Sequence, residues 1–426
     1  MIEGLQERSN LLEVLEFEPE SLEAALQRQA WRDAVIQPEE VASIAPEDDH
    51  TRAAQLGDQL VDVVEQGWDT MNTGKLLMMA SLDLTSESET TYENITQVYI
   101  IQHGVLRNCR DYYCNMLRAL TGTLKKDIEE MEATLASRGI LVVAPQFAAE
   151  ADLEGCEEEE VLCWPYNDWR SGEPASVGCA PISSYAAMDA VINLVRKKCP
   201  QLKLINGAGN SEGGQFWDRY GAFGNALEQF EKEVEGGTVE VTAFNMGTTL
   251  SFNTYRPYAP PEGRFLWETK YSSEEEKDTM SPLPLNVSDW GWYEVEEDSI
   301  ANTWPFGMHN PPPYIQAILQ GPLKRPAEKS TNPLTQAIKN YLRRVTVAVG
   351  RDDSSPVASQ LPTGEGPDQQ GADRVARAWY KWLHMHILAS HYKEGPNARL
   401  LTVRGTGHAA LPMMLGARAM LDLEYE

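Results

Sequence analysis

The chain has 426 residues and a hydrophobic fraction of 42%, enough for one large α/β domain with insertions or for two domains. Lysine and arginine number 36 against 64 aspartate and glutamate residues, so the formal net charge is −28. A surface this acidic argues against nucleic acid and anionic membranes as partners. No apolar stretch is long enough to cross a bilayer.

The first eight residues, Met1 to Arg8, contain neither the basic n-region nor the apolar h-region of a secretory signal. We therefore expect a cytoplasmic protein, or a secreted one if the chain is a mature form. Six cysteines and two glycosylation sequons, at Asn94 and Asn286, would suit the second case. The cysteines form no C-x-x-C pair, so the sequence predicts no metal site.

Residues 1–70 are predicted to form a helical appendage, which packs on a main domain of residues 71–426. Capping and stop signals place three helices in the appendage, at about residues 11–18, 20–36 and 51–67. This part is acidic and carries no obvious chemistry.

Strands and helices then alternate along the main domain. The predicted strands cover residues 76–84, 98–102, 140–144, 239–244, 345–349 and 400–403, with a further strand beginning at Lys203. The predicted helices cover about residues 123–137, 184–198, 371–392 and 411–423, with another after residue 211. Continuous apolar strands that alternate with helices predict an α/β fold, with a mostly parallel sheet covered by helices on both faces. Ligands bind such sheets at the carboxyl ends of the strands.

One segment, about residues 247–342, is rich in proline, tryptophan, tyrosine and acid. A structureless loop of this length is unusual inside a compact domain, so we predict a cap insertion over the active site. The alternative is a surface subdomain unrelated to the site. An aromatic cap would suit a substrate with a partly apolar acyl or alcohol group.

The most informative motif is Gly209-Asn-Ser211-Glu-Gly213, which follows an apolar strand and opens a predicted helix. A G-x-S-x-G turn between a strand and a helix holds a serine in a strained conformation, with its oxygen projecting into a cleft. The flanking glycines avoid collisions with the strand and the helix. We therefore predict that Ser211 is a nucleophile; the alternative is a glycine-rich loop that happens to contain a serine.

Acyl transfer by a serine needs a base, an orienting acid and an oxyanion site, and the acid and base follow the serine in this order in hydrolases. Asp353 follows the strand at 345–349, and His408 follows the strand at 400–403. Both loops lie at the strand ends where Ser211 is expected. Asp352 is the alternative acid, because either residue follows the turn at residue 350.

The oxyanion site is predicted from the turn after the strand at 98–102 and from the elbow. We assign the N–H groups of Val105 and Glu212 as donors, with Gly104 as the alternative to Val105. Glu212 is unusual, because a carboxylate facing the site would repel an oxyanion; we expect its side chain to point away or to contact the cap. Three tryptophans are predicted to contact substrate: Trp164, Trp169 and Trp304. A structural role for the loop that carries Trp164 and Trp169 is the alternative.

These motifs resemble the α/β-hydrolase superfamily, and within it a group of bacterial and fungal enzymes with an A-G-H-S-x-G-G-Q elbow. The matching segments begin with Gln102–Asn108, Ala144–Phe147 and Trp164–Gly172, and continue with Ala208–Gln215, Gly350–Asp353 and Val403–His408. The resemblance covers about residues 74–425. It implies an α/β-hydrolase fold and a triad of Ser211, Asp353 and His408. Asn210 stands where the group usually has histidine, and Glu212 where it has a small or apolar residue.

The sequence thus predicts a serine hydrolase that cleaves a small-molecule carboxylic ester, or a related acyl bond, through an acyl-enzyme and without a cofactor. Two alternatives concern the site itself, and a third concerns the appendage. One is a non-catalytic protein of the same fold that binds a ligand or a partner. The other is an acyltransferase that uses the same triad. The acidic appendage also allows an adhesion or interaction protein built on this fold.

Overall fold

The computed structural model describes the greater part of the chain after residue 70 and two short segments before it. The described residues are 31–35, 59–66, 71–84, 90–123, 126–149, 152, 161–176, 181–258, 291–320, 332–355, 361–371, 373–392 and 399–420.

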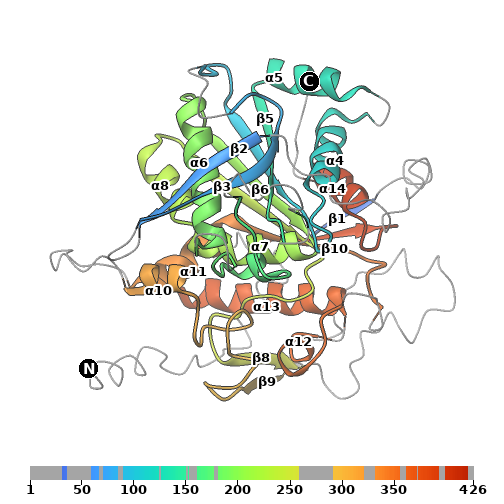
Figure 1. Cartoon of the computed structure of the whole chain (residues 1–426). Coiled ribbons are helices and arrows are strands. Elements are labelled where there is room, and N and C mark those ends of the chain that lie inside the picture. The colour runs from blue at the N-terminus through green and yellow to red at the C-terminus, as the bar shows by residue number, and fades with distance from the viewer. Residues whose placement is uncertain are drawn as a thin grey trace.

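A nine-stranded sheet forms the centre of the described structure, in the order β1-β11-β10-β7-β6-β4-β5-β3-β2 (Figure 1). Its strands are β1 (Trp31–Val35), β2 (Gln59–Gln66), β3 (Met71–Ala80), β4 (Gln97–Gln102), β5 (Ile140–Gln146), β6 (Leu204–Asn210), β7 (Thr238–Phe244), β10 (Val345–Gly350) and β11 (Arg399–Arg404). From β1 to β5 all neighbours in this order are parallel, and only β3 and β2 are antiparallel to their neighbours.

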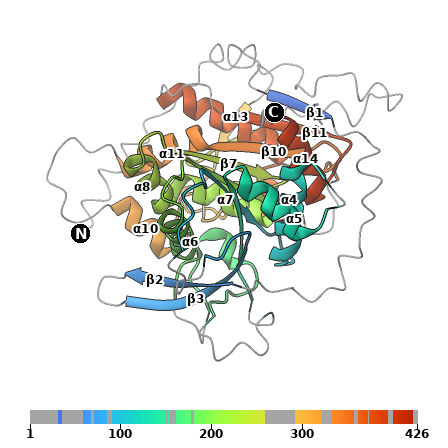
Figure 2. The same cartoon turned by 90° about the horizontal axis from the view of Figure 1, so that it is seen from above.

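Helices cover both faces of this sheet, and the alternation of side chains along each strand explains why. Val98 and Ile100 of β4 face one core, while Tyr99 and Ile101 face the other. The first core is completed by α6 (Ser184–Lys198), α7 (Glu212–Phe223), α8 (Asn225–Glu233), α11 (Pro333–Arg344) and α13 (Arg374–Tyr392). The second core is completed by α4 (Cys109–Thr121), α5 (Ile128–Ser137) and α14 (Ala410–Met420), as Figure 2 shows from above.

This arrangement confirms the predicted fold class, a mostly parallel sheet with helices on both faces. The predicted strands of the main domain are confirmed to within a few residues, and the clearest of them, β5 and β10, are short, mostly apolar runs that are buried along their whole length. Helix starts also follow the expected chemistry. The side chain of Ser183 accepts a hydrogen bond from the Tyr185 N–H at the start of α6, and Asp127 caps α5 in the same way.

The N-terminal prediction is wrong where the structure describes it. Residues 31–35 and 59–66 were expected in helices, but they are strands β1 and β2 at opposite edges of the central sheet. Pairing with β11 and β3 overrides the local helical pattern. The predicted helix at 11–18 and the remainder of residues 1–70 lie outside the described residues.

The predicted insertion at 247–342 is described in part. It contains a two-stranded antiparallel hairpin, β8 (Tyr255–Tyr258) with β9 (Gly291–Glu294), and helix α10 (Pro313–Gln320). Its final part, α11, packs into the first core beside α7, where the Tyr341 hydroxyl donates to Asp218 at 2.5 Å. A short helix, α12 (Glu365–Asp368), follows β10. The role of the insertion as a cap stays a prediction.

Within the part of the chain that the structure describes, no helix is long and apolar enough to cross a membrane. Four of the six cysteines are described as free thiols, namely Cys109, Cys114, Cys163 and Cys199.

Candidate active site

Ser211 lies at the carboxyl end of β6, in the sharp turn that leads into α7. Its backbone has φ 59° and ψ −116°, a conformation that a non-glycine residue adopts only under strain. The Ser211 N–H donates to the Phe244 carbonyl at 3.0 Å, which ties the turn to the end of β7. The geometry is the one expected of a nucleophile elbow.

The glycines around Ser211 are required because backbone approaches too closely for a side chain. A Cβ on Gly209 would lie 2.4 Å from the Gly213 carbonyl, and a Cβ on Gly213 would lie 2.3 Å from the Gln102 oxygen. A Cβ on Gly214 would lie 2.5 Å from the Phe244 oxygen. The small residues that the motif predicts therefore have a steric cause at each position.

Asp353 and His408, on the loops after β10 and β11, are brought together by the structure. The Nδ1 atom of His408 lies 2.7 Å from Oδ2 of Asp353. Because a carboxylate accepts, Nδ1 carries the proton and Nε2 is left available as a base. Asp353 is 5% exposed and is also paired with Arg374, whose Nη1 lies 3.2 Å from Oδ1. Asp352 is exposed, whereas the buried Asp353 carboxylate contacts His408, so the geometry favours Asp353 over Asp352 as the candidate acid.

Both Ser211 and His408 are described, and no hydrogen bond joins the serine hydroxyl to the histidine ring. Their neighbours are nevertheless connected, because Nδ2 of Asn210 donates to the His408 carbonyl at 3.0 Å. Catalytic hydrogen bonds are often longer before substrate binds, so the pair stays a candidate.

Asn245, directly after β7, connects three loops of the site. Its Nδ2 donates to Oδ1 of Asn210 at 3.0 Å and to the Gly407 carbonyl at 3.1 Å. Its Oδ1 accepts from the Gly350 N–H at 2.8 Å. Asn245 is fully buried and has φ 46°, a left-handed conformation that asparagine tolerates better than most residues. One side chain thus fixes the serine, acid and histidine loops relative to one another.

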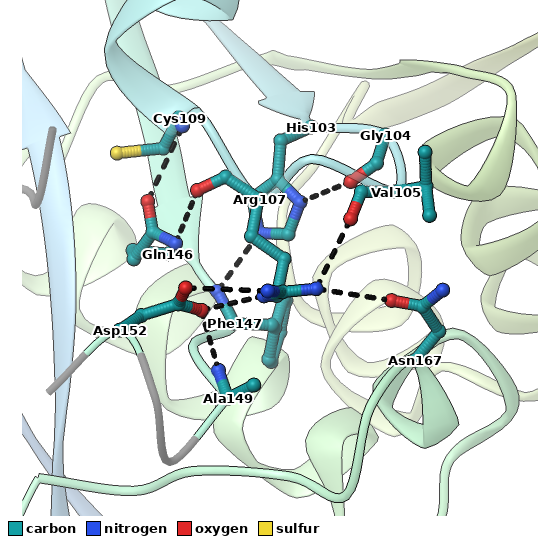
Figure 3. A network of polar contacts seen from close by, with 10 residues as sticks. All are labelled: His103, Gly104, Val105, Arg107, Cys109, Gln146, Phe147, Ala149, Asp152 and Asn167. Carbon is teal, nitrogen blue, oxygen red and sulfur yellow. Dashed lines mark hydrogen bonds and ion pairs between the residues drawn. The ribbon is translucent and has the colours of Figure 1, made fainter. Parts of the chain in front are cut away.

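The predicted oxyanion turn lies next to Ser211. A Cβ on Gly104 would lie 3.6 Å from the Ser211 Cβ and 2.7 Å from the Tyr112 hydroxyl, so a larger residue at 104 would require the Tyr112 side chain to move. The neighbouring His103 ring is fully buried and bonded at both nitrogens (Figure 3). Its Nδ1–H donates to the Gly104 carbonyl at 3.0 Å, and its Nε2 accepts from the Phe147 N–H at 2.9 Å. Burial lowers the pKa of His103 to about 3, so the ring is neutral.

The Glu212 side chain is turned toward the loop of residues 165–172. Its Oε1 accepts from Arg170 Nη1 at 2.5 Å and from Asn167 Nδ2 at 3.0 Å. Burial raises the pKa of Glu212, while the charge of Arg170 opposes that shift. The expectation that this carboxylate does not face the oxyanion agrees with these partners, and its own N–H opens α7.

The three predicted substrate-binding tryptophans are buried. Trp164 and Trp169 are 0% exposed, and the Trp169 ring lies 4.6 Å from the His103 ring. Trp304 is 7% exposed, and its Nε1 donates to the Ser171 carbonyl at 2.8 Å. The structure places all three in packing positions, beside the site but not on an accessible surface.

Several polar residues around the site were not singled out in the sequence. They are Arg107, Asp152, Asn167, Arg170, Asn245 and Arg374. Asn245 carried a usable signal, because it is a polar residue at the carboxyl end of the strand next to the nucleophile strand. Arg107, Asn167 and Arg170 lie within segments that carry the resemblance, but no pattern in the sequence assigns them a role; Asp152 and Arg374 lie outside the quoted segments.

Comparisons with models of protein families and with curated proteins found no match. Among solved structures, the chain is similar to poly(aspartic acid) hydrolase-1 from Sphingomonas sp. KT-1, with 15% identity, a TM-score of 0.44, and 86% of this chain and 99% of that chain covered. It is also similar to a poly(3-hydroxybutyrate) depolymerase from Bordetella parapertussis, with 18% identity, a TM-score of 0.43, and 82% and 85% covered. Likeness at this level carries no argument about activity. The order of the sheet, its two helical layers and the turn at Ser211 are those of an α/β-hydrolase fold.

Proposed function

We propose that this protein is a serine hydrolase that cleaves carboxylic esters. The observation that carries the proposal is the arrangement at one edge of the sheet, where the strained Ser211 turn adjoins the loops that hold the His408–Asp353 pair. An activated serine requires such a base, oriented by a third group.

In the proposed reaction, Ser211 Oγ attacks the ester carbonyl carbon while His408 Nε2 takes its proton. Asp353 holds the ring in the required tautomer and stabilises the imidazolium that forms. His408 then returns the proton to the leaving alcohol, which departs and leaves an acyl-enzyme. Water, deprotonated by His408, then attacks the acyl carbon; the bond to Ser211 Oγ breaks, His408 returns the proton to that oxygen, and the acid is released.

The developing oxyanion would be held by the backbone N–H groups of Val105 and Glu212. Within the described residues, the Val105 N–H donates to no other backbone group, and the Glu212 N–H is in the first turn of α7, where helices leave such groups unpaired. The amino end of α7 adds a favourable dipole for negative charge.

Turnover of p-nitrophenyl acetate and butyrate, compared between the wild type and Ser211→Ala, tests the proposal. We expect the wild type to release p-nitrophenol and Ser211→Ala to fall to the background rate. Addition of alcohols and thiols as acceptors separates hydrolysis from acyl transfer, because a transferase forms the new ester or thioester in preference to the acid. A wild type that is folded but does not turn over either ester would favour the alternative of a non-catalytic protein of this fold that binds a ligand or a partner.

A further inference from the structure

The residues that carry the two proposed oxyanion donors are connected by side chains that do not touch the reacting atoms. We propose that Asn167 is a positioning residue that couples Val105 to Glu212 through Arg107. This inference rests on the proposed function, because it assigns a task within the same site.

Asn167 is 1% exposed and lies between a carboxylate and a guanidinium. Its Nδ2 donates to Oε1 of Glu212 at 3.0 Å, and its Oδ1 accepts a longer contact of 3.5 Å from Nη1 of Arg107. The opposite orientation of the amide would face the oxygen toward the carboxylate and the NH₂ toward the guanidinium. The two charged partners therefore fix the amide in one orientation.

Arg107 carries the connection to the first donor residue (Figure 3). The same Nη1 donates to the Val105 carbonyl at 3.1 Å. Asp152 holds the guanidinium through two contacts, 2.5 Å to Nε and 3.2 Å to Nη2. The Asp152 carboxylate is itself held by the Ala149 N–H at 2.8 Å. Because Asp152 binds Nε and Nη2, Nη1 of Arg107 is left to contact Val105 and Asn167.

The backbone of the turn is held independently at the same point. Arg107 has φ 55°, and its carbonyl accepts from Nε2 of Gln146 at 2.5 Å. The Oε1 of that glutamine accepts from the Cys109 N–H at 3.2 Å. The turn that presents the Val105 N–H thus depends on side chains from β5 and from the loops at 152 and 167, and not on its own sequence alone.

The charges along this chain of contacts are balanced. Arg107 is paired with Asp152, and Arg170 is paired with Glu212. An unpaired Glu212 carboxylate would repel an oxyanion formed at its own N–H, so its contacts with Arg170 and Asn167 reduce that repulsion. Asn167 joins the two pairs without adding charge.

The test compares Asn167→Ala with Asn340→Ala in the full chain. Asn340 is equally buried, at 1% exposed, and its side chain bonds within α11 to Gln336 and Arg343. We would measure kcat and KM for p-nitrophenyl acetate, the thermal midpoint, and the Ki of an alkyl trifluoromethyl ketone, which forms an anionic adduct with serine. In addition, Asn167→Asp keeps the acceptor for Arg107 but turns an oxygen toward Glu212.

We expect Asn167→Ala and Asn167→Asp to lower kcat by about 10- to 100-fold with KM within about threefold, because loss of one oxyanion donor lowers kcat by about 100- to 1,000-fold. The affinity for the ketone should fall in parallel, while Asn340→Ala changes neither. Unchanged kcat and Ki in the Asn167 variants, or equal losses in Asn340→Ala, would overturn the inference alone. Absence of Ser211-dependent turnover in the wild type would overturn the proposed function and this inference together.

Discussion

The side-chain amide of Asn245 donates to the side-chain oxygen of Asn210 at 3.0 Å, and this contact joins the end of β7 to the residue before the proposed nucleophile. In the group of enzymes with the A-G-H-S-x-G-G-Q elbow, which this elbow resembles, a histidine usually stands at position 210. Here the residue is Asn210, whose side chain accepts from Asn245 and donates to the His408 carbonyl. The departure at 210 therefore has a structural role: it contributes to the alignment of the serine and histidine loops.

Replacing Asn245 by alanine should disturb the whole site, because it removes the three hydrogen bonds that connect the loops at 210, 350 and 407. We expect a loss of about 2–4 kcal/mol in the free energy of unfolding, since buried partners are left unsatisfied. Urea denaturation measures it, and Asn94→Ala, which removes one exposed contact to Ala136, serves as the control. Equal stability of the two variants would contradict this role for Asn245.

Asp353→Asn should nearly abolish ester hydrolysis and leave substrate binding intact. An amide in this place favours the wrong histidine tautomer, and the loss of kcat in other triad enzymes is about 10⁴-fold. Asp352→Asn is the matched control, because the neighbouring carboxylate is exposed, and it should retain nearly full activity. If steady-state kinetics instead showed a large loss of kcat in Asp352→Asn and nearly full activity in Asp353→Asn, Asp352 would be the acid of the triad.

Two of the buried histidines, His103 and His384, should make the protein sensitive to acid. Burial lowers the pKa of His103 from 6.5 to about 3, and that of His384 well below 6.5. Between pH 6.5 and pH 3 the unfolded chain binds a proton at His103 that the folded protein does not bind. The contribution of the neutral ring to the free energy of unfolding is therefore fully present above pH 6.5 and is lost as the pH falls toward 3. For His103 the loss amounts to up to about 5 kcal/mol.

The prediction is checked by urea denaturation of the wild type and His103→Gln across pH 7 to 4. We expect the variant to be less stable at pH 7 but to lose stability with a shallower slope, because one titrating group is absent. The dependence of the free energy of unfolding on pH should become weaker still in a variant that also lacks His384. Identical slopes in all three proteins would show that these rings titrate normally.

Gly213→Ala should destabilise the elbow strongly, since its Cβ would lie 2.3 Å from the Gln102 oxygen and 2.6 Å from the His103 oxygen. Backbone must move to relieve such contacts, which costs about 1–3 kcal/mol or more. At Gly407 a new Cβ has its nearest neighbour at 3.6 Å, an ordinary contact, so Gly407→Ala should change the thermal midpoint little. Similar midpoints for the two variants would argue against the close packing of the elbow.

The central strands and the elbow could be predicted because their signals are local. The strands at 98–102 and 140–144 are apolar except for Gln102, and their burial on both sides follows from that. The elbow combines a strand, a serine between glycines and a helix within about ten residues.

Edge strands could not be predicted in the same way. The β2 segment has apolar residues spaced as in a helix, and only its run of β-branched valines favours a strand. The β1 segment pairs with β11, more than 350 residues further along the chain, and no local pattern reveals such a partner.

The site shows the same division. Ser211, Asp353 and His408 follow strands, and parallel strands place such residues at one edge. The contacts of Asn167 and Asn245 are with residues far away in the sequence, so only the structure reveals these contacts. The tryptophans differ from these residues: Trp164 and Trp169 are conspicuous in the sequence, and in the structure both are fully buried, so their contact with substrate stays a prediction.

Labelling with a fluorophosphonate, followed by intact mass and peptide mapping, tests most directly whether Ser211 is an activated nucleophile. The account predicts a single adduct on Ser211 of the wild type, none on Ser211→Ala, and much slower labelling of His408→Ala. A folded wild type that neither this reagent nor a smaller one such as phenylmethylsulfonyl fluoride modifies, or a Ser211→Ala variant labelled at the wild-type rate, would contradict it.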